Sequence, residues 1–387
     1  RKAGLDLWYV IRFKGSAEQI AEDFGEIAGV NHVEIPRKIT KVGDVGRKSA
    51  TPWRKLMALP KAVPATGTPI RVVTGGIPPL KGASVAEKME DMRRNHDWLR
   101  TCIMQQPRGF LSLVGAILTE PCSPEADYGV FYIDALTYQP MCGAGTLSVA
   151  KVLVETGMVK RVEPETKIVL ETPTGLVTVY VKWENHMVAS INLENVPAFL
   201  YRKELHIDLA GYGDVSVDIG YGGNFFVLAD VHSLGLTITK DTVNLLRSLS
   251  KDILAAANKV IKVAHPTNPA INYLDQVLFC QNVPEEDGGY LAQCIFGDAQ
   301  ADISPCGTGT STRLAQRYFR GLIGLEETFV QKSVCGGAFH AKGLRETTLG
   351  GVPAIVPYVS CSDVHITGFN HLIVEENDKL KNGFVSW

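Results

Sequence analysis

Short apolar runs recur along most of this chain and are separated by turns rich in glycine, proline and polar residues. Runs of this length, enriched in β-branched and aromatic residues, predict β-strands. We expect strands at residues 70–73, 130–133, 167–171, 176–182, 188–193, 215–219, 225–228, 354–359 and 364–366.

Four longer segments carry apolar residues at helical spacing. They predict helices over residues 85–102, 146–156, 240–263 and 310–320. The strands outnumber the helices and do not alternate with them regularly. This order predicts an α+β fold rather than a doubly wound parallel sheet.

The first 60 residues have a pattern of their own. A strand at 7–11, a helix at 18–24 and a strand at 30–35 are followed by a stretch, 41–69, rich in Pro, Gly, Lys and Thr. Such a composition is typical of a linker. We therefore expect residues 1–60 to form an N-terminal extension (strand–helix–strand) with a linker.

One pattern, Cys-Gly-x-Gly-Thr, occurs twice. It begins at Cys142 and again at Cys306, and both times it opens an apolar predicted helix. A repeated unit in a chain of 387 residues indicates internal duplication. We expect one half at 61–200, joined by 368–387, and another at 201–367. A pseudo-twofold axis would then bring the two cysteines face to face.

Two facing cysteines suit the inversion of a carbon centre. A two-base racemase removes the Cα proton on one side of the substrate and returns a proton on the other. Cysteine is suited to be such an acid/base group because its pKa, ordinarily near 8.5, falls at a helix N-terminus. A thiolate and a thiol can then share the work of general base and general acid.

The glycines of the repeat complete this chemistry. They permit tight turns and a close approach of substrate to the backbone. The free N–H groups at the two helix starts can bind a carboxylate and stabilise the enediolate-like charge that develops on deprotonation. The mechanism needs neither pyridoxal phosphate nor metal, so we expect no cofactor.

Composition and charge limit the possible partners, metal sites and compartment of the protein. The formal net charge of −2 favours neither nucleic acid nor an anionic membrane as partner, and no apolar run is long enough to span a membrane. Eight cysteines occur without a CxxC pair or zinc-type spacing. Free thiols favour a reducing, cytoplasmic compartment, although the chain begins without Met and a removed secretory leader stays an alternative.

With these residues in view, the sequence from about residue 68 to 384 resembles the proline racemase family. The strongest match is the segment 301–311, Ala-Asp-Ile-Ser-Pro-Cys-Gly-Thr-Gly-Thr-Ser. Further matches are Tyr-Gly-Gly-Asn-Phe-Phe at 221–226, Ser-Pro-Glu-Ala-Asp at 123–127, His-Pro at 265–266 and Ile-Thr-Gly-Phe at 366–369.

The resemblance implies a fold and a set of site residues. The fold would be similar to that of diaminopimelate epimerase, with two pseudo-symmetric α/β halves, each a curved sheet around a central helix, in a homodimer. Carried over to this sequence, the two thiols fall on Cys142 and Cys306. The substrate-binding positions fall on Val114, Gly143, Ala144, Gly145, Phe226, Phe296, Asp302, Gly307 and Thr308.

Three positions depart from the family pattern. Ala144 stands where the family usually has His, Thr68 where it has Glu, and Ile303 where it has Arg. Each change removes a polar group from the neighbourhood of the predicted site. The departures favour a substrate with a more apolar side chain, or a catalytically weak relative.

The prediction is therefore an isomerase that racemises or epimerises proline or hydroxyproline at Cα with two thiols. The presence of both cysteines favours this over the family's trans-3-hydroxyproline dehydratase activity, in which one thiol is replaced. Two alternatives stay open: a non-catalytic protein that binds a small imino-acid carboxylate, and a form regulated by a disulfide between Cys142 and Cys306.

Overall fold

The structure is a computed structural model that describes residues 53–64 and 67–385. Residues 54–387 form one compact unit. The strand–helix–strand unit expected over residues 7–35 lies outside the described residues. Among the helices that are described, none combines the length and the apolar character needed to cross a membrane.

The strands predicted from the apolar runs are all present, and most extend further than expected. They are β2 (Ile70–Val73), β4 (Tyr128–Ile133), β6 (Glu165–Thr172), β7 (Gly175–Glu184), β8 (Met187–Glu194), β10 (Gly213–Tyr221), β11 (Phe225–Asp230), β17 (Val352–Cys361) and β18 (Val364–Glu375). Pairing with neighbouring strands lengthens them, because it satisfies backbone groups whatever the side chains are.

Other strands were missed by the sequence pattern. They are β1 (Trp53–Pro64), β3 (Val114–Thr119), β5 (Tyr138–Gln139), β9 (Phe199–Leu209), β12 (Gln276–Cys280), β13 (Tyr290–Phe296), β14 (Gln300–Ala301), β15 (Phe329–Lys332) and β16 (Ala338–Leu349). Strand β1 corrects part of the expected linker, since it pairs with β2. Strand β12 is buried at every position, so it has no polar–apolar alternation to reveal it.

The helices follow the prediction with two differences. They are α2 (Val85–Asn95), α3 (Asp97–Met104), α4 (Gly143–Glu155), α5 (Val243–Val260) and α6 (Gly307–Phe319), with a short 3₁₀ turn, η2 (His232–Leu234). The single helix expected at 85–102 is broken at His96, whose φ of −139° and ψ of 19° are not helical. Helices α4 and α6 begin earlier than expected, directly after the two cysteines.

The strands pair in a mixed parallel and antiparallel order that occurs twice. Strands β2 and β3 are parallel, β3 and β4 antiparallel, β4 and β6 parallel, and β6, β7 and β8 antiparallel. The same succession relates β11 and β12, β12 and β13, β13 and β15, and then β15, β16 and β17. Strands β8 and β17 pair with each other and join the two series.

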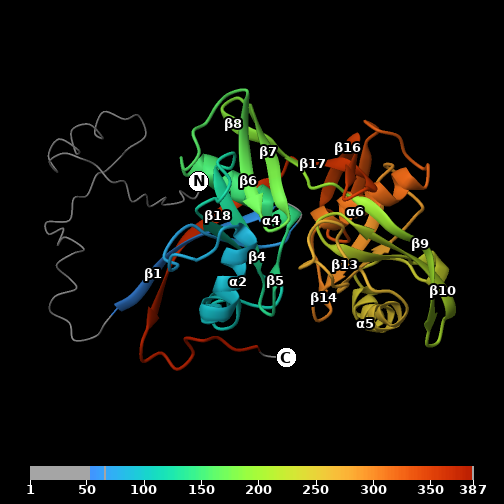
Figure 1. Cartoon of the computed structure of the whole chain (residues 1–387), viewed down its shortest axis with the longest axis horizontal. Helices are drawn as coiled ribbons and strands as arrows, with labels where there is room; N and C mark the ends of the chain where they lie inside the picture. Colours follow the sequence, from blue (N-terminus) through green and yellow to red (C-terminus); the bar gives the residue numbers. More distant parts are fainter. Residues whose placement is uncertain (1–52, 65–66, 386–387) are drawn as a thin grey trace, which may run out of the picture. The chain divides into compact units, whose positions relative to one another are not determined.

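Each cysteine-bearing helix lies among its own strands (Figure 1). Helix α4 contacts β2, β3, β7, β8 and β18, and helix α6 contacts β9, β10, β11, β16 and β17. Helix α4 is apolar on nearly all sides and buried along most of its length. The buried side chains around both helices belong to one continuous hydrophobic core, which holds the two helix starts in place.

Candidate active site

A narrow cavity opens where the starts of α4 and α6 meet. Most of the site residues predicted from the sequence line it: Val114, Cys142, Gly143, Ala144, Phe296, Asp302, Cys306, Gly307 and Thr308. Two predicted residues do not. Gly145 follows Ala144 in α4, and Phe226 is fully buried in a small cluster that also includes Cys294, Phe296 and Cys306.

Cys142 is the N-cap residue of α4. Its backbone is extended, and its Sγ accepts a hydrogen bond from the N–H of Gly145 at 3.4 Å. The hydroxyl of Thr146 donates to the carbonyl of Cys142 at 2.8 Å. The thiol thus takes the place that Ser, Thr or Asp usually has at a helix start, where backbone N–H groups favour negative charge.

Cys306 repeats this arrangement at the start of α6. Its Sγ accepts from the N–H of Gly309 at 3.3 Å, and the hydroxyl of Thr310 donates to its carbonyl at 2.7 Å. Its backbone differs, because φ is 65° in a residue that is not glycine. Such a conformation costs on the order of 1–3 kcal/mol and persists only where the surrounding structure enforces it.

Two glycines allow the helix starts to touch. A Cβ added to Gly143 would lie 2.7 Å from the Cα of Gly307, and one added to Gly307 would lie 2.8 Å from the Cα of Gly143. Both separations are too short for a real contact, so any side chain would push the backbones apart. The glycines therefore set the spacing at which the two thiols share one cavity.

Burial raises the pKa of the Cys142 thiol to about 12, although the N–H groups of Gly145 and Ala144 act in the opposite direction. The expectation that the helix start would lower this pKa is wrong for Cys142. Removal of the thiol from water outweighs the favourable N–H groups. In this conformation Cys142 keeps its proton at neutral pH.

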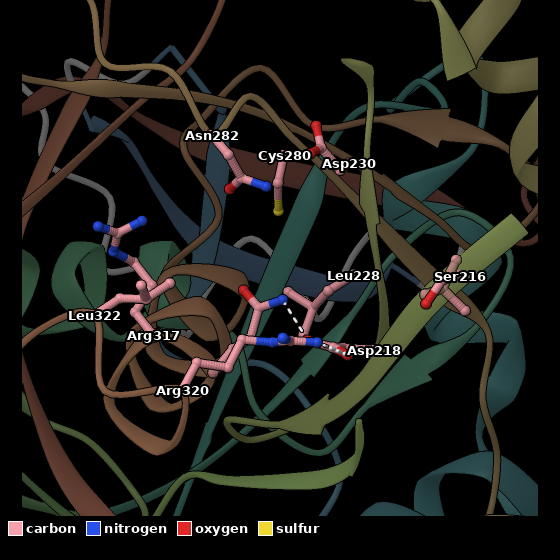
Figure 2. A pocket seen from close by; sticks show the side chains of 11 residues that line it. Ser216, Asp218, Leu228, Asp230, Cys280, Asn282, Arg317, Arg320 and Leu322 are labelled. Carbon is pink, nitrogen blue, oxygen red and sulfur yellow. Dashed lines mark hydrogen bonds and ion pairs between the residues drawn. The ribbon is translucent and has the colours of Figure 1, made fainter. Parts of the chain in front are cut away.

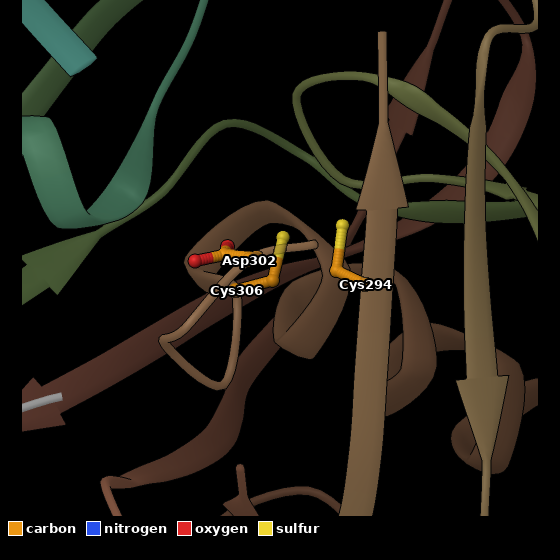
Figure 3. Close-up of side chains that lie close together, drawn as sticks. All are labelled: Cys294, Asp302 and Cys306. Carbon is orange, nitrogen blue, oxygen red and sulfur yellow. The ribbon is translucent and has the colours of Figure 1, made fainter. Parts of the chain in front are cut away.

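Asp302 lies beside Cys306 (Figure 3). Its Oδ1 accepts hydrogen bonds from the hydroxyl of Thr68 at 2.9 Å and from the N–H of Ser304 at 2.8 Å. Burial raises its pKa, and these hydrogen bonds offset part of that rise. The carboxyl group is thus oriented by the chain and is surrounded by protein.

Sequence reasoning missed several residues of the cavity as binding candidates. They are Thr68, Gln139, Met141, Asn224, Gln276 and Cys294. Thr68 was noted only for replacing a family Glu, yet it positions Asp302. Asn224 lies within a family-like motif, and its amide donates to the carbonyl of Met141 at 3.2 Å. Cys294 precedes Phe296 by two residues in β13, so strand periodicity could have placed both on one face.

Among the described residues, the group able to hold a metal ion is Cys294, Asp302 and Cys306. One ligand atom of each lies within 4.8 Å of the others. The spacing of cysteines along the sequence did not suggest this cluster, because β13 and the start of α6 meet only in the folded chain. All eight cysteines are free thiols.

A second, wider cavity of about 420 Å³ contains none of the predicted site residues. Asp218 and Arg320 lie beside it and form an ion pair with an N–O distance of 2.7 Å (Figure 2). Gln316 also donates to Asp218, at 2.7 Å. Since these polar groups satisfy one another, they favour a structural role over ligand binding.

Known proteins are similar to this chain in sequence and in fold. The pattern of the family described as "Proline racemase" matches residues 62–385. A proline racemase of Clostridioides difficile is 39% identical over 319 residues, which cover 82% of this chain and 95% of that protein. A trans-3-hydroxy-L-proline dehydratase of Burkholderia cenocepacia is 36% identical over 320 residues, again 82% and 95%.

A solved structure agrees with the present one over most of its length. It is that of a hydroxyproline epimerase from Agrobacterium vitis with bound trans-4-hydroxy-L-proline, with a TM-score of 0.81 and 28% identity, covering 86% of this chain and 96% of that one. The mixed sheets and few helices agree with the α+β fold that the sequence predicted. By sequence and by fold, this chain belongs to the proline racemase family.

Proposed function

We propose that this chain racemises or epimerises proline or hydroxyproline at Cα, with Cys142 and Cys306 as the two acid/base groups. The observation that carries the proposal is the contact of Gly143 with Gly307, which brings two cysteine-capped helix starts to one cavity. A substrate between them would have one thiol on each side of its Cα, as inversion requires.

The proton balance follows from the two thiols. A thiolate at one cysteine removes the Cα proton and becomes a thiol, while the thiol at the other gives its proton to the opposite face and becomes a thiolate. Cys142, whose pKa is raised by burial, supplies the thiol in the resting protein. For one enantiomer of the substrate Cys306 acts as the base, and the roles of the two thiols exchange for the other enantiomer.

The helix starts and Asp302 would hold the substrate. The N–H groups of Gly143, Ala144, Gly307 and Thr308 lie in the first turns of α4 and α6, where they suit the substrate carboxylate and the charge that develops on it. Asp302 would contact the amine. All of these groups belong to the chain, so the mechanism assigns no step to a cofactor.

The cavity wall combines apolar and polar side chains. Val114, Ala144 and Phe296 offer no hydrogen bond to a ring hydroxyl, whereas the amides of Gln139 and Gln276 do. A buried hydroxyl without a partner is unfavourable by about 1–3 kcal/mol, so hydroxyproline would need one of these amides. The lining therefore suits both proline and hydroxyproline, and the exchange experiment compares them.

The repeated pairing order supports a duplicated architecture. We infer two pseudo-symmetric halves, 61–200 with 368–387 and 201–367, each with a sheet curved around its cysteine-bearing helix. The strand successions β2 to β8 and β11 to β17 support it, as does the shared cysteine-cap geometry. A homodimer, usual in the family, is part of this proposal.

A non-catalytic binding protein is the second candidate. It is favoured by Ala144, which places a methyl group where the family usually has an imidazole. In that case proline or pyrrole-2-carboxylate would raise the melting temperature, but no proton would exchange.

The test follows the Cα–H signal of L-proline and trans-4-hydroxy-L-proline by proton NMR in D₂O with reduced protein. We expect the wild type to exchange this proton and Cys142→Ser and Cys306→Ser to lose at least about 100-fold of the rate. Cys335→Ser is the matched control, because Cys335 is exposed and lies outside the cavity.

The outcomes separate the candidates. Exchange in the wild type that both cavity substitutions abolish supports two-thiol chemistry. Full turnover in either mutant would rule it out. Tight binding of proline without proton exchange in the wild type would favour the second candidate, a non-catalytic binding protein.

A further inference from the structure

The cavity contains a third thiol for which the proposed reaction has no use. Cys294, in β13, is almost fully buried, and its Sγ lies within 4.8 Å of both the Cys306 Sγ and a carboxylate oxygen of Asp302. In Figure 3 the side chains of Cys294 and Cys306 lie side by side and point in the same direction. Cys142, the other proposed acid/base group, is not part of this cluster.

Two sulfur atoms and one carboxylate oxygen form a donor set for soft divalent cations. Zn²⁺ binds thiolates at about 2.3 Å and carboxylate oxygens at about 2.0–2.2 Å in tetrahedral geometry, which places two sulfur ligands about 3.8 Å apart. The three atoms here need to move together by no more than about 1 Å to reach that arrangement. Mg²⁺ and Ca²⁺ prefer oxygen ligands and do not fit it.

The backbone already holds the three ligands in this relation. The N–H of Asp302 donates to the carbonyl of Cys294 at 2.9 Å, and the side-chain amide of Gln293 donates to the carbonyls of both residues. The Oδ1 atom of Asp302 is held by Thr68 and Ser304. Since hydrogen bonds fix the segments that carry the ligands, a cation would find the site largely formed.

We propose that Cys294, Asp302 and Cys306 form a binding site for a soft divalent cation, Zn²⁺ or Cd²⁺, and that its occupation inhibits the enzyme. Binding releases whatever protons the two sulfur atoms carry, and it forms two metal–sulfur bonds and one metal–oxygen bond to Asp302, with water as a fourth ligand. Cys306 then has no free thiolate with which to take a proton from Cα. The inhibitory part rests on the proposed two-thiol function, whereas cation binding does not.

The first experiment measures binding without turnover. Reduced protein is titrated with Cd²⁺, and the ultraviolet sulfur-to-cadmium charge-transfer absorption is recorded. We expect one high-affinity site in the wild type, and an affinity lower by at least about 100-fold in Cys294→Val and in Asp302→Asn. Valine has a similar volume to cysteine, and circular dichroism with the melting temperature verifies that each variant is folded.

Two controls decide which thiols bind. Cys142→Ala and Cys335→Ser should keep the high-affinity site. Unchanged Cd²⁺ affinity in Cys294→Val overturns the proposal. Loss of the site in Cys335→Ser also overturns it, since the cation would then bind at the surface. Loss in Cys142→Ala would show a cation bridging the two acid/base thiols instead, which equally contradicts the proposed ligand set.

The second experiment measures inhibition. Zn²⁺ is added to the wild type and to Cys294→Val, and Cα–H exchange of proline is expressed relative to each protein's own rate without metal. We expect Cys294→Val to need at least about 100-fold more Zn²⁺ for half inhibition than the wild type. Absence of exchange in the wild type refutes the proposed function but leaves the Cd²⁺ result standing, so the two failures can be told apart.

Discussion

At the scale of single residues, the two thiols share a geometry but not an environment. Each Sγ accepts from the N–H three positions later, Gly145 for Cys142 and Gly309 for Cys306. Only Cys306 has a strained backbone and belongs to the cluster with Cys294 and Asp302. The first cysteine is therefore a plain helix cap, and the second is the centre of a polar cluster.

Thr68 positions the carboxylate of this cluster. Thr68→Val removes the 2.9 Å hydrogen bond to Asp302 and leaves a buried oxygen less well satisfied. Hydrogen bonds to charged groups contribute about 1.5–3 kcal/mol, so we expect kcat/KM for proline to fall by at least about 10-fold.

Thr68→Ser is the matched control, because it keeps the hydroxyl and should retain most of the rate. Equal losses in the serine and valine variants would contradict the role of the hydroxyl, because the serine variant retains it. Steady-state polarimetry of both variants gives the comparison.

At the scale of elements, the position of α4 relative to α6 depends on the absence of two side chains. Gly143→Ala would bring its Cβ to 2.7 Å from the Cα of Gly307, and backbone cannot move aside as a flexible side chain can. A misplacement of about 1 Å lowers turnover by roughly 100-fold. We expect that loss, measured as proline racemisation.

Gly75→Ala serves as the control for this substitution. A Cβ at Gly75 meets nothing within 4 Å, and its φ is not in the left-handed region. It should leave both the rate and the melting temperature nearly unchanged. A Gly143→Ala protein with wild-type activity would contradict the proposed role of the helix contact.

The far end of α6 is held by a buried ion pair. Asp218, in β10, accepts from both Arg320 and Gln316 and is 4% exposed. Burial raises the pKa of Asp218, but the hydrogen bonds from Arg320, from the N–H of Glu204 and from Gln316 outweigh it, so the pKa lies below its usual value. This pair fixes α6 to the sheet that supports it.

Asp218→Asn should lower the free energy of unfolding by about 1–3 kcal/mol, because Arg320 and Gln316 lose a charged, buried acceptor, while Arg320 keeps its ion pair with Glu204. A carboxyl whose pKa is depressed by folding stabilises above its unfolded pKa, about 3.9, and loses that contribution as the pH falls through the folded pKa. The difference between variant and wild type in urea unfolding should therefore shrink below about pH 4.

Asp214→Asn is the surface counterpart. Asp214 contacts His206 at 2.8 Å, but both side chains are largely exposed. Its effect should stay below about 1 kcal/mol. Comparable losses in the two variants would refute the special contribution of the buried pair.

At the scale of the whole molecule, the C-terminal segment packs against a loop near the beginning of the described chain. Residues 376–385 return to the loop after α3, where Phe384 and Gln106 exchange two backbone hydrogen bonds of 3.0 and 3.1 Å. Arg108 pairs with Asp378 and donates to the carbonyl of Leu380 at 3.2 Å. These contacts support the assignment of 368–387 to the half that contains α4.

Arg108→Gln should weaken the contact between the C-terminal segment and the loop after α3. Arg108 is 14% exposed, but Asp378 is only half-buried and Leu380 is exposed, so we expect a small loss of stability, seen as a melting temperature lower by about a few degrees. Arg94→Gln, which removes an exposed ion pair with Glu90, is the control and should have little effect. An equal response of both variants in thermal unfolding would mean that the C-terminal segment adds no stability.

Sequence patterns located the strands with clear apolar runs and the helix starts at both cysteines. They failed at β12, which is buried throughout, and at β9, where charged residues such as Lys203 interrupt the run. They also failed at Thr68, whose partner Asp302 lies 234 residues away, and at Cys294, which meets Asp302 and Cys306 only through the turn from β13 to the start of α6. Phe226 was placed in the site by resemblance; it does not line the cavity but is buried in a cluster with Cys294, Phe296 and Cys306, which do.

The sequence by itself determined the α+β class, the family and the paired cysteine-capped helices, because local spacing and glycine positions dictate these features. The tertiary structure alone decided how closely the helix starts approach, since only packing brings Gly143 against Gly307. It also decided that burial outweighs the helix start in the pKa of Cys142, because desolvation depends on what the whole fold places around the thiol. The cluster of Cys294, Asp302 and Cys306 likewise exists only where β13 lies beside the start of α6.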